Sequence, residues 1–172
     1  MKGYIHVYTG GGKGKTTAAL GLALRAAGAG MTSFMGQFLK GQQYSELKAA
    51  ELLRPFLTIE QFGRDTFVHV KKATPEDRSM AQAGLERMKS VLVSGAYSLV
   101  IFDEINVAVA LDLLAVDQVL QVLALKPKPV EVVLTGRAAP QEFIDAADLV
   151  TEMKEIKHYY QNGTQARIGI EK

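Results

Sequence analysis

Short apolar runs alternate with longer amphipathic segments along most of the chain. Runs rich in β-branched and aromatic side chains predict strands at residues 4–9, 33–39, 57–62, 97–103, 130–135 and 149–153. Apolar positions at helical spacing, bounded by Gly or Pro, predict helices at residues 16–28, 45–53, 75–93, 116–125 and 140–147. The polar remainder carries an Asn162–Gly163 turn signal, from which we expect a terminal strand or hairpin.

The regular alternation of strands and helices determines the expected fold class. It predicts an α/β fold of three layers, αβα, with a mainly parallel sheet covered on both faces. The chain has 172 residues without an internal repeat or linker, which predicts a single domain over residues 1–172. Hydrophobic residues make up 48% of the chain and charged residues 22%, a composition that excludes a disordered protein.

Charge and cysteine content remove several classes of function. A formal net charge of +2 gives no basis for expecting a nucleic acid or a membrane surface as partner. The absence of cysteine excludes disulfides, thiolate metal sites and a cysteine nucleophile. The first residues lack the apolar stretch of a signal peptide, and no later segment reaches the roughly 18 apolar residues that span a bilayer. These features predict a cytoplasmic protein.

The segment TGGGKGKTT at residues 9–17 lies between the first predicted strand and the first predicted helix. This is the context of a P-loop, in which glycines let backbone N–H groups turn inward around phosphate oxygens at a helix N-terminus. Thr9 stands where the usual motif has glycine, and the alternative is a glycine-rich turn with solvated lysines. Because the strand–loop–helix context is met, we expect phosphate binding by Gly10, Gly11, Gly12, Lys13, Gly14, Lys15, Thr16 and Thr17.

An acidic pair, Asp103 and Glu104, follows the apolar run YSLVIF at residues 97–102, which is typical of a Walker B element. Ligands of open α/β sheets bind outside the carboxyl ends of the strands, so the pair is expected to face the phosphate loop. Mg²⁺ or Mn²⁺ suits these carboxylates together with the Thr16 hydroxyl, and we favour Glu104 as the direct ligand. The alternative is a pair of helix-capping acids. Kinases, ATPases, GTPases and nucleic-acid motors share both elements, so these do not define a reaction.

Further segments narrow the reaction: YTGGGKGKTTAALGLALRAAG at residues 8–28, QFLKG at 37–41, FDEINVA at 102–108, LTGRAAPQEFIDAADLVTEMKEIKH at 134–158 and ARIGIEK at 166–172. In order and spacing, the chain resembles the P-loop corrinoid adenosyltransferases (ATP:cob(I)alamin adenosyltransferases) nearly from end to end. The resemblance implies transfer of the 5′-deoxyadenosyl group of ATP to the Co(I) of a reduced corrinoid, with release of triphosphate. It further implies a RecA-like fold, a homodimer, a flavoprotein reductase as supplier of Co(I), and ATP bound with its γ end in the loop.

The resemblance also assigns roles to individual residues. Lys15 and Arg137 of LTGR become catalytic groups on the phosphate side, and Arg25 lies where the family has an arginine near the nucleotide. Arg25 fits a solvated helix residue equally well. For Arg137 the alternative is a cap on a strand end, and we favour the phosphate-side role. Asn106 either holds the loop after the acidic pair or caps a helix.

On the corrinoid side, the resemblance points to Phe67, His69 and Tyr159. The chain departs from the family here, because it has no Trp. On the nucleotide side it departs at Gly11, which stands where many relatives have an Asn that contacts the nucleotide. Two other functions stay open on the residues alone. One is a P-loop ATPase or kinase that cleaves ATP at the γ-phosphate, and the other is a nucleotide-dependent binding module without chemistry.

Overall fold

The computed structural model describes residues 2–42, 44–64 and 73–171. Its centre is a six-stranded sheet in the order β3–β2–β4–β5–β1–β6, and every described pairing is parallel. All carboxyl ends therefore lie at one edge of the sheet. The strands are β1 (Ile5–Thr9), β2 (Ser33–Phe38), β3 (Leu57–Phe62), β4 (Leu99–Asp103), β5 (Glu131–Thr135) and β6 (Leu149–Glu152).

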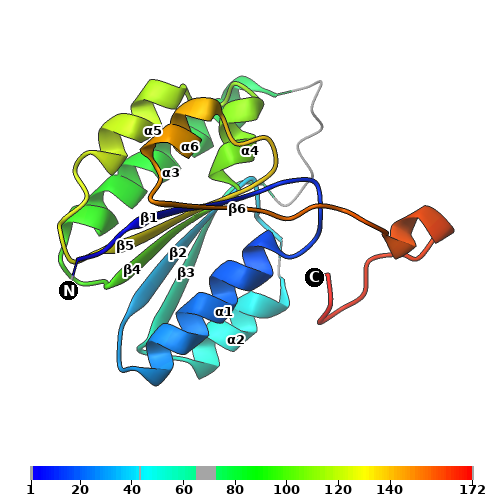
Figure 1. Ribbon diagram of the computed structural model, residues 1–172, viewed down its shortest axis with the longest axis horizontal. Helices are drawn as coiled ribbons and strands as arrows, with labels where there is room; N and C mark the ends of the chain where they lie inside the picture. Colours follow the sequence, from blue (N-terminus) through cyan, green and yellow to red (C-terminus); the bar gives the residue numbers. More distant parts are fainter. Residues whose placement is uncertain (1, 43, 65–72, 172) are drawn as a thin grey trace.

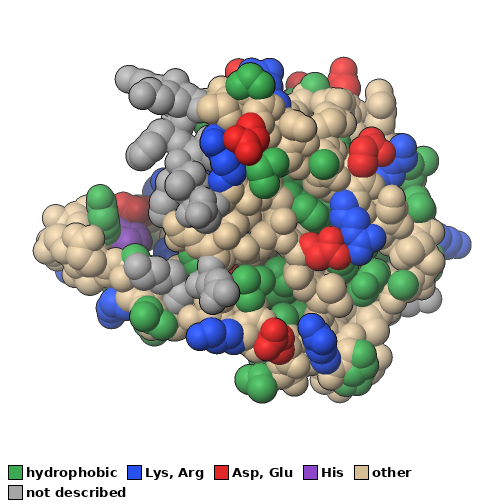
Figure 2. Space-filling view, turned by 180° about the vertical axis from the view of Figure 1, so that it is seen from behind, with side chains coloured by type: hydrophobic (Ala, Val, Ile, Leu, Met, Phe, Trp, Pro, Cys, Tyr) green, Lys and Arg blue, Asp and Glu red, His purple; other side chains and the backbone are tan. Residues whose placement is uncertain are grey.

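Helices cover both faces of the sheet (Figure 1). On one face lie α1 (Lys15–Gly28) and α2 (Ser45–Leu52). On the other lie α3 (Pro75–Val93), α4 (Ile105–Ala110), α5 (Val116–Leu123) and α6 (Gln141–Ala146). The short 3₁₀ helix η1 (Tyr159–Asn162) and the rest of the C-terminal segment extend away from the sheet (Figures 1 and 2). The three-layer α/β arrangement predicted from the alternating elements is confirmed.

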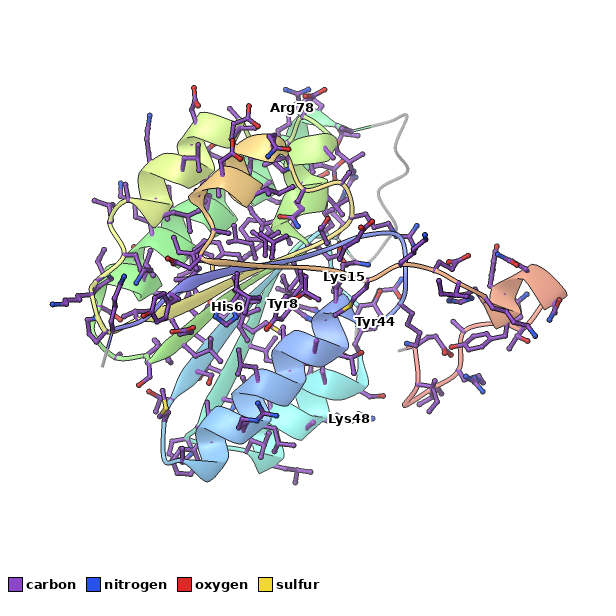
Figure 3. The ribbon with its side chains drawn as sticks, viewed as in Figure 1. His6, Tyr8, Lys15, Tyr44, Lys48 and Arg78 are labelled. Atoms are coloured by element: carbon purple, nitrogen blue, oxygen red, sulfur yellow. The ribbon has the colours of Figure 1, made fainter. Side chains whose placement is uncertain are left out.

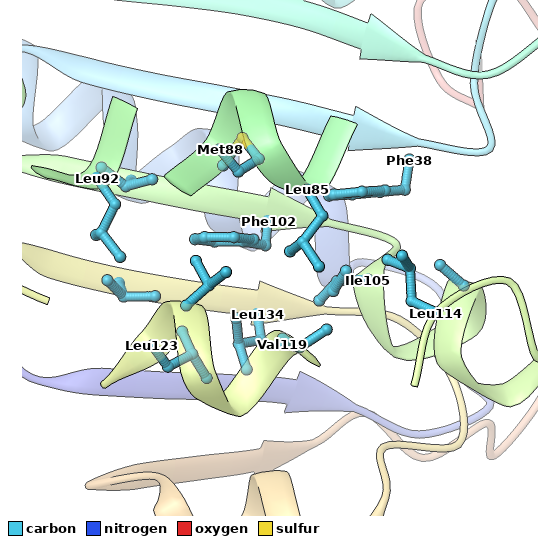
Figure 4. Close-up of a cluster of buried hydrophobic side chains, with 14 of the residues drawn as sticks. Phe38, Leu85, Met88, Leu92, Phe102, Ile105, Leu114, Val119, Leu123 and Leu134 are labelled. Carbon is cyan, nitrogen blue, oxygen red and sulfur yellow. The ribbon is translucent and has the colours of Figure 1, made fainter. Parts of the chain in front are cut away.

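Strand β4 shows how the core is divided between the two faces. All five of its residues are buried, as expected for a central parallel strand covered on both sides. Side chains alternate across a strand, so Val100 and Phe102 pack with α3 and α5, whereas Leu99 and Ile101 pack with α1 and α2. The first of these two clusters is shown in Figure 4. The sheet is thereby packed between two apolar layers.

Two features of the chain differ from the sequence-based expectation. Residues 154–171 contain no strand or hairpin; Gly163, with φ of 82°, instead ends η1 as its left-handed C-cap. Helix α4 was not predicted, because its residues INVAVA are too few and too uniformly apolar to show helical periodicity. The other element boundaries differ from the expected ones by at most two residues.

The N-terminus of α3 is fixed by a capping box that also engages an arginine. Asp77 N–H donates to Thr74 Oγ1 (3.2 Å), and Asp77 Oδ2 accepts from Thr74 N–H (2.9 Å). Arg64 donates to both carboxylate oxygens of Asp77, at 2.8 and 2.6 Å. Burial acts to raise the pKa of Asp77, but the hydrogen bonds from Arg64 and Thr74 outweigh it and hold the pKa below its ordinary value. The carboxylate is therefore stabilised in its charged form.

Replacing Asp77 by Asn is expected to lower the free energy of unfolding by about 1–2 kcal/mol near neutral pH, through loss of charge-assisted hydrogen bonds at the cap. The folded-state pKa of Asp77 is lowered, so its contribution is present above the ordinary aspartate pKa and disappears as the pH falls through the folded-state pKa. Urea denaturation at neutral and acid pH should show the two proteins converging in acid. Glu76→Gln is the control, since the Glu76 side chain is 67% exposed. A pH-independent difference for Asp77→Asn would contradict this assignment.

Candidate functional site

The phosphate loop occupies residues 10–14, between the end of β1 and the start of α1. Gly10 and Gly14 have φ of 95° and 122°, a backbone region that L side chains rarely adopt. Lys15 Nζ donates to the carbonyl oxygens of Gly10 (2.8 Å) and Gly12 (2.7 Å), so its side chain lies across the loop. Figure 3 shows Lys15 at the carboxyl edge of the sheet, beyond His6 and Tyr8 of β1. Burial lowers the pKa of Lys15.

Thr9, the departure from the usual motif, is the last residue of β1 and has no left-handed φ. A glycine is therefore not needed there for conformational reasons. The Thr9 hydroxyl instead accepts a hydrogen bond from Ala139 N–H (3.2 Å), in the segment that follows β5. The Thr9 hydroxyl thus links the start of the phosphate loop to the segment between β5 and α6.

The loop packs closely against the end of β6. Gly12 N–H donates to the carbonyl oxygen of Met153 (2.6 Å). A Cβ added at Gly12 would lie 2.7 Å from that oxygen, whereas a Cβ added at Gly11 would meet no atom within 4 Å. The two neighbouring glycines therefore have different structural requirements.

Gly12→Ala is expected to destabilise the protein by about 1–3 kcal/mol, because backbone rather than a flexible side chain must move aside. Gly11→Ala, the matched control, is expected to change stability by less than about 0.5 kcal/mol. Thermal denaturation of the two variants and the wild type measures this difference. Equal stability of the two variants would show that Gly12 does not pack closely against the Met153 carbonyl oxygen.

Asp103, the last residue of β4, is fully buried. It accepts hydrogen bonds from four side chains, and we call these five residues the hub of the site. Its Oδ1 accepts hydrogen bonds from the hydroxyls of Thr16 (2.8 Å) and Thr135 (2.7 Å). Its Oδ2 accepts from Lys40 Nζ (2.9 Å) and Gln37 Nε2 (3.2 Å). A carboxylate offers about four lone-pair sites, so these donors use its acceptor capacity. One side chain thus joins α1, β5 and the end of β2.

Glu104 follows with φ of 61°, in the left-handed region, and its N–H donates to Thr135 Oγ1 (3.0 Å). Within the part of the chain that the structure describes, its carboxylate accepts no hydrogen bond. Burial raises the pKa of Glu104, and the negative charge of Asp103 raises it further. Three cations act in the opposite direction, which places their charges near this carboxylate: Lys40, Lys15 and Arg137. Among the described residues, the Glu104 carboxylate therefore has acceptor capacity to spare and lies near positive charge.

Arg137 lies in a tight turn after β5, where Gly136 has φ of 132° and Ala138 has φ of 53°. Asn106 Nδ2 donates to the carbonyl oxygen of Gly136 (3.0 Å) and so ties this turn to α4. Asn106 thus holds the turn after β5 rather than the loop after the acidic pair, and no side chain of the described residues caps the N-terminus of α4. Arg137 is exposed. Its positive charge nevertheless acts on the loop, because it contributes to lowering the pKa of Lys15.

Lys13 and Tyr159 are both engaged with the C-terminal segment. Lys13 Nζ donates to the carbonyl oxygen of Ile170 (2.8 Å) and lies 4.0 Å from Glu171. The Tyr159 hydroxyl donates to Glu171, and the Arg167 guanidinium lies 4.9 Å from the Tyr159 ring centre. Gly12, Lys13 and residues 154–159 together line an open cavity of about 350 Å³. Lys13 is thus turned away from the interior of the loop, where Lys15 lies.

Of the remaining predicted residues, only Arg25 lies in the described part of the chain, and it lies away from the loop. Arg25 is exposed in the last turn of α1. It lies ten residues beyond Lys15, which is about 15 Å along a helix. Phe67 and His69 lie outside the described residues. Among the described residues, no group of three or more His, Cys, Asp and Glu side chains forms a metal site of its own. The described helices include none that is both long and apolar enough to cross a membrane.

Three residues of the hub were not singled out from the sequence: Gln37, Lys40 and Thr135. The signal was present, because each lies at or just after the carboxyl end of a predicted strand, within the segments QFLKG and LTGR. What the sequence could not indicate was that their strands lie on either side of β4. Only the strand order brings these donors to one carboxylate.

Comparison with known proteins identifies a family and a related fold. The family described as ATP:corrinoid adenosyltransferase BtuR/CobO/CobP matches residues 1–171. In structure, the chain is similar to the RadB recombinase, with a TM-score of 0.52 and 13% sequence identity over 91% of this chain and 77% of the other. That likeness concerns the fold alone and confirms the expected RecA-like arrangement.

Relatives of known sequence point to the same family. A corrinoid adenosyltransferase of Sinorhizobium sp. is 38% identical, over 99% of this chain and 80% of its own. One of Escherichia coli (strain K12) is 34% identical, over 99% of this chain and 86% of its own. An uncharacterised Nostoc protein is 42% identical over 92% of this chain, which spans only 45% of the Nostoc protein's length. With a family match over almost its whole length, the chain belongs to the ATP:corrinoid adenosyltransferase family.

Proposed function

We propose that this chain transfers the 5′-deoxyadenosyl group of ATP to the Co(I) of a reduced corrinoid, with the loop at residues 10–14 holding the triphosphate. The observation that carries the proposal is the contact of the Thr16 hydroxyl with Asp103 (2.8 Å), which joins a phosphate loop to an acidic pair in a member of this family. Lys15 and Arg137 supply positive charge at the same edge of the sheet. The site is thus suited to a polyphosphate rather than to a proton-transfer reaction.

The proposed reaction needs no general acid or general base from the protein. The cobalt electron pair attacks C5′, a Co–C bond forms, and the C5′–O bond breaks with its electrons leaving on the triphosphate. Cobalt passes formally from Co(I) to Co(III), and no proton moves at carbon. The protein aligns the two reactants, which is worth about 7–11 kcal/mol at best, and stabilises the charge of the leaving group.

The loop amides, Lys15 and Arg137 are proposed to bind the triphosphate. Thr16 and Glu104 are proposed to hold Mg²⁺ or Mn²⁺ directly, with Asp103 behind them. The Thr16 hydroxyl donates its hydrogen bond to Asp103, so its oxygen lone pairs are available to a cation. The Glu104 carboxylate accepts no hydrogen bond from the described residues. The donor set fits a hard cation that also takes phosphate oxygens as ligands. Such an ion would neutralise part of the triphosphate charge.

Anaerobic incubation with ATP, Mg²⁺ and chemically reduced cobalamin tests the proposal. We expect the absorbance spectrum of adenosylcobalamin to appear, with one triphosphate released for each adenosyl group transferred. ADP and phosphate as products would instead indicate an ATPase or kinase. Unchanged ATP would indicate a binding module.

Further parts of the proposal rest on the resemblance and the sequence. They are a homodimer, a flavoprotein reductase that supplies Co(I), a cytoplasmic location, and residues 1–172 as one functional domain. Contacts of Arg25 with the nucleotide, and of Phe67, His69 and Tyr159 with the corrinoid, likewise stay predictions.

A further inference from the structure

Lys40 occupies an unusual place for a lysine that lies outside the phosphate loop. It follows β2, its side chain is only 16% exposed, and its Nζ lies 2.9 Å from Asp103 Oδ2 and 3.7 Å from Glu46 Oε1. The ammonium also lies 5.3 Å from the ring centre of Tyr44. Lys40 therefore directly contacts the fully buried Asp103, and no other lysine or arginine of the described residues does so.

The backbone around Lys40 is held in one position. Leu39 has φ of 63°, an uncommon conformation for a residue with a branched side chain. A Cβ added at Gly63 would lie 2.5 Å from Lys40 N, and one added at Gly41 would lie 2.3 Å from the carbonyl oxygen of Gly63. The turn after β2 is thus pressed against the end of β3, and strain of this kind persists only where the surroundings enforce it.

The contacts of Asp103 show what this fixed cation does. With Lys40 and Gln37 on Oδ2, the other oxygen, Oδ1, is left to accept from Thr16. A charged Asp103 requires the Thr16 hydroxyl to donate, so the hydroxyl oxygen turns its lone pairs away from Asp103. If the charge of Lys40 were lost, a buried carboxylate would stand beside Glu104 without its nearest counter-charge.

We infer that Lys40 is a positioning residue for the cation site: it holds Asp103 so that Asp103 accepts the hydrogen bond of the Thr16 hydroxyl, which leaves the lone pairs of the Thr16 oxygen free to bind Mg²⁺. The inference rests on the Mg²⁺ and triphosphate part of the proposed function, and is independent of transfer to cobalt. Outer residues that orient metal ligands in this way typically change metal affinity by about 10–100-fold.

Calorimetric titration of ATP, with Mg²⁺ and with EDTA, tests the inference without any corrinoid. In Lys40→Met we expect the gain in ATP affinity on adding Mg²⁺ to fall by about 10-fold or more. The affinity for ATP in EDTA should stay within about twofold of wild type, because the loop itself is untouched. Lys40→Arg keeps the charge and is expected to retain most of the increase in ATP affinity that Mg²⁺ produces. Lys48→Met, an exposed lysine on α2, is the matched control and should behave as wild type.

Two results would overturn the inference. One is that Mg²⁺ increases the ATP affinity of Lys40→Met by as much as it increases that of the wild type. The other is an equal loss of affinity with and without Mg²⁺, which would assign Lys40 to the loop or to the fold in general. If Lys40→Met does not fold, Lys40→Gln, which retains a hydrogen-bond donor for Asp103 but no charge, must show the same selective loss. Because cobalt is absent from the titration, a failure of adenosyl transfer would leave this readout intact.

Discussion

Replacement of Lys15 by Ala is expected to slow adenosyl transfer by about two to three orders of magnitude. Lys15 Nζ lies across the loop, within 2.8 Å of two of its carbonyl oxygens, where it can neutralise charge that grows on the departing triphosphate. Removing one such preorganised donor from an active site typically costs about 10²–10³ in kcat. The measurement is the initial rate of adenosylcobalamin formation at saturating ATP.

Lys13→Ala is the informative comparison for this variant. Both lysines belong to the same loop, but Lys13 Nζ is bonded to the carbonyl oxygen of Ile170 in the C-terminal segment. We therefore expect a much smaller loss of rate from Lys13→Ala than from Lys15→Ala. Equal losses would mean that both ammonium groups face the triphosphate during the reaction, contrary to the arrangement described here.

Replacement of Asp103 by Ala is expected to lower the free energy of unfolding by about 3 kcal/mol or more. The substitution leaves the Lys40 ammonium largely buried without its 2.9 Å partner, and a buried pair that loses one member typically costs about 3–5 kcal/mol. The hydroxyls of Thr16 and Thr135 also lose their acceptor. Urea denaturation at neutral pH measures the change.

A double substitution separates the unpaired charge from the other contributions. Asp103→Ala combined with Lys40→Met removes both charges, and we expect it to recover much of the stability lost in Asp103→Ala alone. The two residues are in direct contact, so their effects should be strongly non-additive. Additive losses would show that the pair is not the main electrostatic contact of Asp103.

The layered fold and both motifs could be predicted because their signals are local. The segment at residues 9–17 shows its strand, loop and helix within one stretch, and the uniformly apolar run before Asp103 indicates a strand buried on both faces. Both patterns are properties of consecutive residues and need no knowledge of what lies beside them in space.

The rest of the site depends on contacts between distant segments. Lys40 and Thr135 meet at Asp103 because β2 and β5 flank β4, and nothing in the sequence near these residues encodes that order. Lys13 is predicted to be a phosphate ligand from the loop sequence, which gives no sign that its Nζ donates to the carbonyl oxygen of Ile170 near the other end of the chain. The Asn162–Gly163 pair is likewise ambiguous in the sequence, because a glycine in the left-handed conformation can end a helix as well as form a hairpin turn.

The central claim is that the loop holds a triphosphate which leaves intact from C5′. The most direct test uses ATP that carries a heavy oxygen isotope in the bridge between C5′ and the α-phosphorus, incubated with the protein, Mg²⁺ and reduced cobalamin. We expect phosphorus NMR of the products to show the isotope in free triphosphate, because the C5′–O bond is the one that breaks. ADP and inorganic phosphate, with the label still attached to the nucleoside, would contradict the claim.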